Sequence, residues 1–240
     1  MIDQKARQIL NQRLARPKLG RIDIRSTLKQ FALINGQNLA LLSVVPFWDA
    51  DFNFVRVAPW LKWQFGQTNH RVYVIDTENN NEHAVWFFGT TLGSRLVHCA
   101  QALWKIPWHY APYNLETDDQ EGSIHYTVGG DWCACDIKLT NTHAPLALQD
   151  GFTSLDEMRL ILTHPVTGYY YCSDSILGSY SIWHEEIPLT MGKPENLYFS
   201  LYDRLGILTP EEMQTPHSIF ISPEIIFDVH LPPKRFPKEP

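Results

Sequence analysis

Two short strand-like runs lie near the middle of the chain: His70–Asp76, in which polar and apolar residues alternate, and His83–Gly89, which is apolar on both faces. Both runs are rich in Val, Ile, Tyr, Trp and Phe, which suit the pleated surface of a sheet. The segment between them, Glu78–Asn81, contains three consecutive asparagines, and Asn favours turns because it tolerates a positive φ. The pattern therefore predicts a central β-hairpin.

Apolar residues then recur at spacings of three and four, which predicts a helix that Pro107 ends: Leu92, Leu96, Cys99, Ala100, Leu103 and Trp104. A similar stripe near the N-terminus, from Ile2 to Leu14, predicts an amphipathic helix that stops before Pro17. This stripe must be covered either by the body of the protein or by a second subunit. A homodimer through the N-terminal helix is therefore one of two interpretations.

Short apolar runs elsewhere predict further strands, at Leu39–Phe47 (fully buried), Tyr113–Leu115, Ser123–Val128, Cys133–Leu139, Arg159–Thr163, Tyr169–Ser173, Tyr180–Ile187, Ile219–Ile221 and Ile225–Leu231. Residues 49–68 are aromatic but irregular, which predicts a loop. Ser154–Glu157 has capping-box spacing, and Leu197, Leu201 and Leu205 fit one face of a short helix. The predicted class is mainly β (α+β), an antiparallel closed β-barrel or cone with flanking helices.

We expect one domain over residues 1–240, with a helical basic arm at 1–25, the β-barrel domain at 26–233 and a mobile tail at 234–240. Residues 1–29 carry eight Lys or Arg against two Asp, so their balance of +6 leaves −12 for the rest of a chain of net charge −6. Nucleic-acid binding is not favoured, because the arm lacks interleaved aromatic residues for stacking on bases. No apolar run approaches the roughly 20 residues that span a bilayer, and the polar N-terminus lacks a secretory signal, so no membrane association and a cytoplasmic location are expected.

The four cysteines do not have the spacing of a zinc knuckle, which uses C-x-x-C pairs or regularly spaced histidines. Cys133 and Cys135 are two residues apart, so on a strand they point the same way. We interpret all four as reduced, at least partly buried thiols, and we expect neither a metal nor a cofactor.

Several short sequence segments are typical of one family: Ala40–Phe47, Phe65–Asn69 with Arg71 and Tyr73, Val85–Phe88, Leu103–Trp108, Tyr180–Glu185 and Pro216–Ser218. Together they resemble the YqjF-like domain of unknown function 2071 family, in the acetoacetate decarboxylase-like superfamily. The resemblance runs from about Arg25 to Pro233. It implies a closed, cone-like β-barrel with flanking helices, and it implies no reaction, because the family has no settled activity.

The superfamily's decarboxylases form a Schiff base through a Lys that follows an aromatic-Pro pair, with a second Lys beside it. In the matching stretch of this chain, Trp108 takes the Schiff-base position and His109 its neighbour. An indole cannot form an imine, so the resemblance implies that Schiff-base decarboxylation does not occur. Lys105 lies at the end of the predicted helix, where a Lys commonly complements the helix dipole.

Alternation puts Asn69, Arg71 and Tyr73 on one face of the first hairpin strand. If that face is inward, Arg71 suits a carboxylate or phosphate; if it is outward, it is an ordinary solvated face. Three histidines lie within the family-like segments, His109, His184 and His217, and each is either a proton-transfer group or a hydrogen-bonded structural residue. His184 and Glu185 point to opposite faces of a strand, so they are not expected to pair.

The resulting hypothesis is a protein that binds or transforms a small anionic organic molecule in the barrel, with catalytic residues unknown. The expected binding residues are Asn69, Arg71, Tyr73, Trp86, Phe88, Trp108, His109 and His184. The alternative is a non-catalytic structural or interaction protein whose barrel is filled by its own aromatic side chains.

Overall fold

The computed structural model describes residues 32–34, 37–39, 41–54, 58–76, 79, 81–118, 120–165, 167–173 and 176–237. The predicted N-terminal helix and the basic arm at 1–25 lie outside the described residues.

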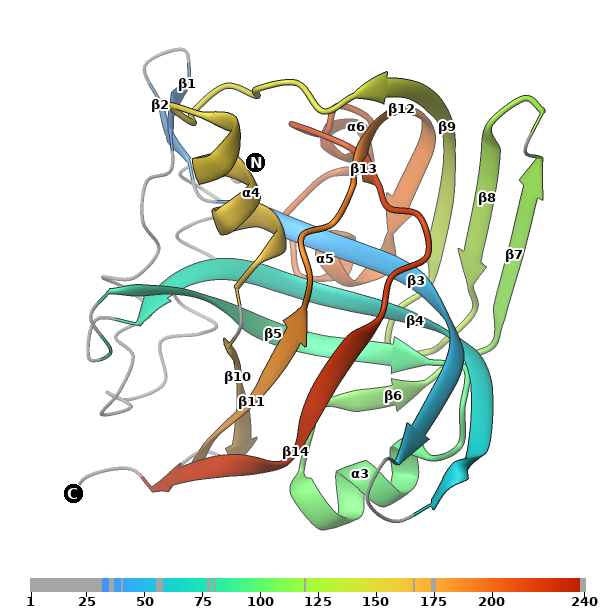
Figure 1. Ribbon diagram of the computed structural model, residues 1–240, viewed down its shortest axis with the longest axis vertical. Helices are drawn as coiled ribbons and strands as arrows, with labels where there is room; N and C mark the ends of the chain where they lie inside the picture. The colour runs from blue at the N-terminus through green and yellow to red at the C-terminus, as the bar shows by residue number, and fades with distance from the viewer. Residues whose placement is uncertain are drawn as a thin grey trace.

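The larger of two main sheets has seven strands and crosses the lower half of Figure 1. Six of them follow one another in the order β14 (Phe227–Pro237), β11 (Ile176–His184), β10 (Thr167–Ser173), β5 (Glu82–Leu92), β4 (Ala58–Asp76) and β3 (Leu42–Phe54). The seventh, β6 (Trp108–Tyr110), also pairs with β5. Both β6 and β10 run parallel to β5, and the other pairs are antiparallel. A parallel neighbour needs a crossover connection, which α3 (Val97–Trp104) supplies between β5 and β6.

The smaller sheet has five strands, three of which stand upright at the right of Figure 1. Their order is β13 (Phe220–Ile221), β12 (Thr190–Phe199), β9 (Cys135–Pro145), β8 (Ser123–Val128) and β7 (Tyr113–Asp118). A separate hairpin joins β1 (Ala32–Ile34) and β2 (Gln37–Leu39). The other described helices are α4 (Leu155–Thr163), α5 (Ser200–Arg204) and α6 (Pro210–Met213). The predicted class, mainly β with flanking helices, is confirmed, with the described strands arranged as two curled sheets.

The predicted central hairpin is β4–β5, with Val72 opposite Trp86, and both of its faces are buried. On one face, Val72 and Trp86 belong to a core that also contains residues of β8, β9 and β12. On the other face, Tyr73 and Phe87 belong to a second core that contains residues of α3 and α4. Two apolar cores explain why the sequence of β5 is apolar on both faces.

The predicted loop at residues 49–68 is wrong, because β3 continues to Phe54 and β4 begins at Ala58. Pro46 lies within β3, opposite Thr68. A proline is tolerated there because β3 lies at the edge of its sheet, where a missing N–H need not interrupt a ladder. An edge position also explains why most of residues 42–48 are only half-buried, whereas the sequence predicted a fully buried strand.

The predicted strand Arg159–Thr163 is also wrong, because these residues form the second half of α4. The helical turn predicted from the capping-box spacing is confirmed there. Ser154 Oγ accepts a hydrogen bond from the Glu157 amide at 3.1 Å, but the Glu157 carboxylate accepts from the Thr153 amide and not from that of Ser154. Leu197 lies in β12 and not in a helix, because it pairs with Ile137 of β9.

Residues 234–237, predicted as part of a mobile tail, continue β14 and pair with Ile176–Ser179. The predicted helix after the hairpin is confirmed over Val97–Trp104, and Lys105 ends it with a left-handed φ of 55°. Leu92, which the spacing placed in this helix, is instead the last residue of β5. None of the described helices has the length and apolar character that crossing a bilayer requires.

Candidate functional site

The guanidinium of Arg71 is held by two neutral side chains. Its Nε donates to Ser43 Oγ at 2.9 Å and one Nη donates to Tyr73 Oη at 3.2 Å. Tyr73 in turn donates to the backbone carbonyl of Leu162 in α4 at 2.7 Å. Arg71 is half-buried, and within the described residues it makes no ion pair. An oriented arginine without a carboxylate partner is suited to receive an anion.

Asn69 lies on the same strand face, two residues before Arg71. Its side-chain oxygen accepts from Thr90 Oγ1 at 2.8 Å and from Gln67 Nε2 at 3.1 Å. Asn69 is 6% exposed. Its side-chain oxygen is already hydrogen-bonded within the protein.

The eight expected binding residues do not share one face of the sheet. Tyr73 and Trp108 belong to the core that contains α3 and α4 residues. Trp86 belongs to the core between the two sheets, and Phe88 packs against that core. The structure thus brings Asn69, Arg71 and Tyr73 together and separates them from Trp86 and Phe88; the part of each residue in binding stays a prediction.

Trp108, the residue at the expected Schiff-base position, is 8% exposed and lies in β6. Lys105 is exposed, and so is every other lysine whose side chain the structure describes, namely Lys62, Lys138, Lys193 and Lys234. A nucleophilic lysine needs a depressed pKa from burial or a neighbouring cation. No described lysine is desolvated in this way.

His109 lies flat against Trp132, with ring centroids 4.1 Å apart and an interplanar angle of 5°. Desolvation in this position lowers the pKa of His109 to about 4. The charge interaction with nearby Cys133 raises the pKa, but this effect is smaller. His109 is therefore neutral near pH 7. Trp132 also contacts His70 edge-on, with centroids 5.7 Å apart.

His70, Cys133 and Cys135 form a buried cluster between the two sheets. Their potential ligand atoms all lie within 4.8 Å of one another. The two sulfurs are 3.7 Å apart, and Cys135 Sγ is 3.9 Å from His70 Nε2. His70 and Cys133 are 0% exposed and Cys135 is 4% exposed. These are the described residues most suited to hold a metal ion.

The position of the two cysteines is fixed by the residue between them. The Ala134 amide donates to Ser200 Oγ at 2.7 Å, and the Ser200 amide donates to the Ala134 carbonyl at 2.9 Å. With the backbone of Ala134 anchored to α5 on both sides, Cys133 and Cys135 both point toward His70. Their sulfurs lie 3.7 Å apart, so the two side chains share one side of the segment.

The two thiols are electrostatically unequal. The hydrogen bond from Cys135 lowers the pKa of Cys133, and hydrogen bonding and charge interaction with His70 act in the same direction. The same bond raises the pKa of Cys135, with burial adding to the effect. Cys133 is therefore the sulfur that most readily becomes a thiolate.

The remaining two expected histidines have structural partners. His184 Nδ1 lies 2.7 Å from the Glu185 carbonyl, and its ring contacts His164. His217 Nε2 lies 2.9 Å from the Asp150 carbonyl, and desolvation lowers the pKa of His217. Neither histidine lies in the His70 cluster.

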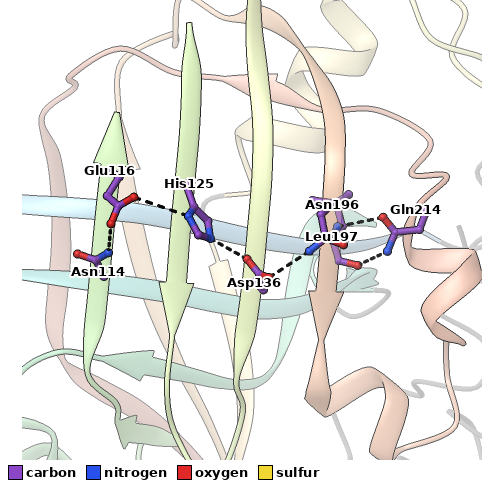
Figure 2. A network of polar contacts seen from close by, with 7 residues as sticks. All are labelled: Asn114, Glu116, His125, Asp136, Asn196, Leu197 and Gln214. Atoms are coloured by element: carbon purple, nitrogen blue, oxygen red, sulfur yellow. Dashed lines mark hydrogen bonds and ion pairs between the residues drawn. The ribbon is translucent and has the colours of Figure 1, made fainter. Parts of the chain in front are cut away.

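A polar network crosses the smaller sheet from β7 to α6 (Figure 2). His125 Nε2 lies 2.9 Å from Asp136 Oδ1, and the other carboxylate oxygen of Asp136 accepts from Asn196 Nδ2 at 3.1 Å. The side-chain amide of Gln214 then bonds the backbone of Leu197 twice, because its oxygen accepts from the Leu197 N–H and its nitrogen donates to the Leu197 carbonyl. These polar groups satisfy one another, so the network stabilises the sheet rather than marking a binding site.

Sequence reasoning missed the His70 cluster, although it recognised that Cys133 and Cys135 point the same way. It also described the cysteines as at least partly buried, whereas Cys99 is exposed. The available signal was the alternation of β4, which places His70 on the face opposite Arg71 and away from the face considered for ligand binding. Only the pairing of the sheets reveals that this face meets the cysteines.

The chain belongs to the DUF2071 family, whose model, described as an uncharacterized conserved protein, matches residues 29–225. The family expected from the sequence phrases is thereby confirmed. No curated protein matches the chain.

Several solved structures are similar. Acetoacetate decarboxylase from Legionella pneumophila is 12% identical with a TM-score of 0.45, covering 72% of this chain and 67% of that one. A second acetoacetate decarboxylase structure is 11% identical with a TM-score of 0.47, covering 98% and 82%. The enduracididine biosynthesis enzyme MppR, complexed with pyruvate, is 12% identical with a TM-score of 0.38, covering 63% of this chain and 60% of that one. This chain thus spans less than two thirds of that MppR chain, and at such identities no reaction or residue role carries over.

Proposed function

We propose that the protein binds a small anionic organic molecule through Arg71, without Schiff-base chemistry. The supporting observation is the guanidinium held by Ser43 and Tyr73 with no ion pair among the described residues. A planar guanidinium fixed by neutral hydrogen bonds keeps its full charge and donors that can bind a carboxylate in two-point fashion.

The exclusion of Schiff-base chemistry is supported by the lysines. Trp108 occupies the position where the superfamily resemblance expects the reactive amine, and an indole forms no imine. The described lysines are exposed, so none has the environment that makes an amine nucleophilic at neutral pH.

The test is calorimetric titration with acetate, acetoacetate, pyruvate and oxalate. Wild type is compared with Arg71→Ala and with Arg95→Ala, a matched control that removes the same charge from an exposed position. We expect at least one probe to bind wild type and Arg95→Ala alike, and to bind Arg71→Ala at least about tenfold more weakly, because hydrogen bonds to charged groups contribute about 1.5–3 kcal/mol. Equal binding by Arg71→Ala defeats the proposal. So does failure of wild type to bind any of the four probes.

Borohydride reduction in the presence of acetoacetate tests the chemistry separately. Intact-mass measurement is expected to find no covalent adduct. An adduct on any lysine would show that an imine forms and would refute this part of the proposal.

A second candidate, an interaction protein with a filled interior, is supported by a different observation. Tyr73, Trp86 and Trp108, all expected to line a ligand site, are 4%, 1% and 8% exposed and belong to the two cores. This candidate predicts a dimer through the N-terminal arm. Sedimentation analysis of the full chain and of a chain lacking residues 1–25 checks it, and a monomer in both cases contradicts it.

A further inference from the structure

His70 is a buried imidazole whose polar partners, within the described part of the chain, are sulfur atoms. No described residue offers its Nδ1 a hydrogen-bond partner, and its Nε2 faces the sulfurs, with Cys135 Sγ at 3.9 Å. The ring is otherwise enclosed by aromatic side chains, Trp132 and Tyr202, whose centroids lie 5.7 and 5.6 Å away. An ion bound between Nε2 and the sulfurs would satisfy the ring nitrogen that faces them, whereas Nδ1, on the other side of the ring, would still need a partner such as water.

The spacing of the three potential ligand atoms fits one metal ion. Two sulfurs on a tetrahedral zinc, each at about 2.3 Å, lie about 3.8 Å apart, and a sulfur and an imidazole nitrogen lie about 3.5 Å apart. The sulfurs of Cys133 and Cys135 are separated by 3.7 Å, and Cys135 Sγ lies 3.9 Å from His70 Nε2. All three potential ligand atoms lie within 4.8 Å of one another, so side-chain rotation has to bring them closer to a common centre when an ion binds.

The surroundings of the cysteines resemble those of metal-bound thiolates. The backbone of Ala134 is held by the hydroxyl and the amide of Ser200. Backbone N–H groups that orient ligand atoms are characteristic supports of metal sites.

We propose that His70, Cys133 and Cys135 form a zinc site that joins the two sheets. Zinc binding displaces the two thiol protons to solvent, so Zn²⁺ with two thiolates is neutral overall. Neutrality matters because the cluster is enclosed in the core, where an uncompensated charge is costly. Cu⁺ shares the preference for thiolates but would leave a net charge of −1.

The proposed site has three protein ligands within the described residues, so a fourth coordination position is left for water or another small ligand. His70 comes from β4 of the larger sheet, whereas Cys135 begins β9 of the smaller sheet. Zinc would thus link segments more than sixty residues apart in sequence. This inference is independent of the anion proposal at Arg71, which concerns the opposite face of β4.

The test begins with zinc content. The full chain is purified under reducing conditions, and metals are measured by inductively coupled plasma mass spectrometry. Zinc affinity is then measured by competition with a coloured chelator. We expect about one zinc per chain. Cys133→Ser and Cys135→Ser should each lower the affinity at least about a hundredfold, because even the loss of outer-shell partners costs 10- to 100-fold. Cys172→Ser, the same substitution outside the cluster, should bind as wild type does.

Two measurements on wild type keep the test decisive if a buried variant fails to fold. X-ray absorption of the zinc-loaded chain should show two sulfur ligands at about 2.3 Å and a nitrogen ligand at about 2.0 Å. Cobalt substitution should give a thiolate-to-cobalt charge-transfer band with tetrahedral d–d bands.

Four outcomes overturn the proposal. They are absence of zinc affinity in wild type, a zinc shell without sulfur, undiminished affinity in folded Cys133→Ser and Cys135→Ser, and preferential occupancy by copper. A Cys133–Cys135 disulfide in the chain as purified, seen as a loss of two hydrogens in the intact mass, also refutes it.

Discussion

His70 Nε2 lies 3.9 Å from Cys135 Sγ, although the two residues belong to different sheets. The next residue along the chain, Arg71, bonds Ser43 and Tyr73 on the other face of the same strand. Two neighbouring residues of β4 therefore serve two separate polar centres. This follows from strand alternation, which sends successive side chains to opposite faces.

The stacking of His109 on Trp132 predicts a specific pH dependence of stability. The pKa of His109 is lowered from 6.5 to about 4 by desolvation, so between these values the unfolded chain binds a proton that the folded chain does not. Above about pH 6.5, His109 has no such effect on the free energy of unfolding. As the pH falls toward 4 the free energy of unfolding decreases progressively, and below about pH 4 this decrease levels off. Because the ring is partly solvated, we expect a loss of only about 1 kcal/mol over this window.

Urea unfolding of wild type and His109→Gln between pH 4 and 7 measures this effect, and the variant should show the flatter profile. His98→Gln, which changes an exposed histidine of α3, is the control and should follow wild type. Parallel profiles for wild type and His109→Gln would contradict the assignment.

Gly168 marks a position where the larger sheet needs a residue without a side chain. A Cβ there would lie 2.2 Å from Phe87 Cε2, and Phe87 is stacked on Tyr180 with centroids 5.3 Å apart. The ring cannot yield without disturbing the stack, so Gly168→Ala should lower the free energy of unfolding by about 1–3 kcal/mol or more.

Gly129→Ala provides the comparison for this glycine. The nearest atom to its added Cβ is Pro112 Cγ at 3.6 Å, an ordinary contact, so stability should be unchanged or slightly raised. Equal midpoints of urea unfolding for the two alanine variants would show that the contact with Phe87 does not destabilise the folded state.

Asp76 is a carboxylate only 1% exposed, and Tyr169 donates its hydroxyl proton to Asp76 Oδ2. Tyr169→Phe removes this donor from a buried charged acceptor. We expect a loss of about 1.5–3 kcal/mol in the free energy of unfolding, measured by urea titration. Tyr110→Phe, at an exposed tyrosine, should have little effect; a similar loss in both variants would rule out the buried bond as the cause.

The network of Figure 2 predicts a smaller, salt-dependent contribution from Asp136. Its two carboxylate oxygens contact His125 and Asn196, and the side chains are partly solvated. Asp136→Ala should therefore cost about 0.5–1 kcal/mol at low ionic strength and less in high salt. Asp131→Ala, at an exposed aspartate, should cost almost nothing, and a loss from Asp136→Ala that does not change with salt would count against an electrostatic origin.

Local patterns were reliable where one segment determines its own structure. The β4–β5 hairpin, the helix before Pro107 and the cap at Ser154 depend on alternation, turn-forming residues and a single hydroxyl, all of which are local. Local patterns failed where neighbours decide. Arg159–Thr163 looked like a strand, yet the burial of Met158, Ile161 and Leu162 against the second core requires a helix there.

The sequence by itself determined the family and the mainly β class, because both depend on residue types in order along the chain. It also determined that Asn69, Arg71 and Tyr73 share a face. Only the tertiary structure decided which face of β4 meets which core, and that His70 lies beside Cys133 and Cys135. Strand periodicity fixes the relative direction of side chains, whereas the packing of two sheets, which involves residues far apart in sequence, fixes what they contact.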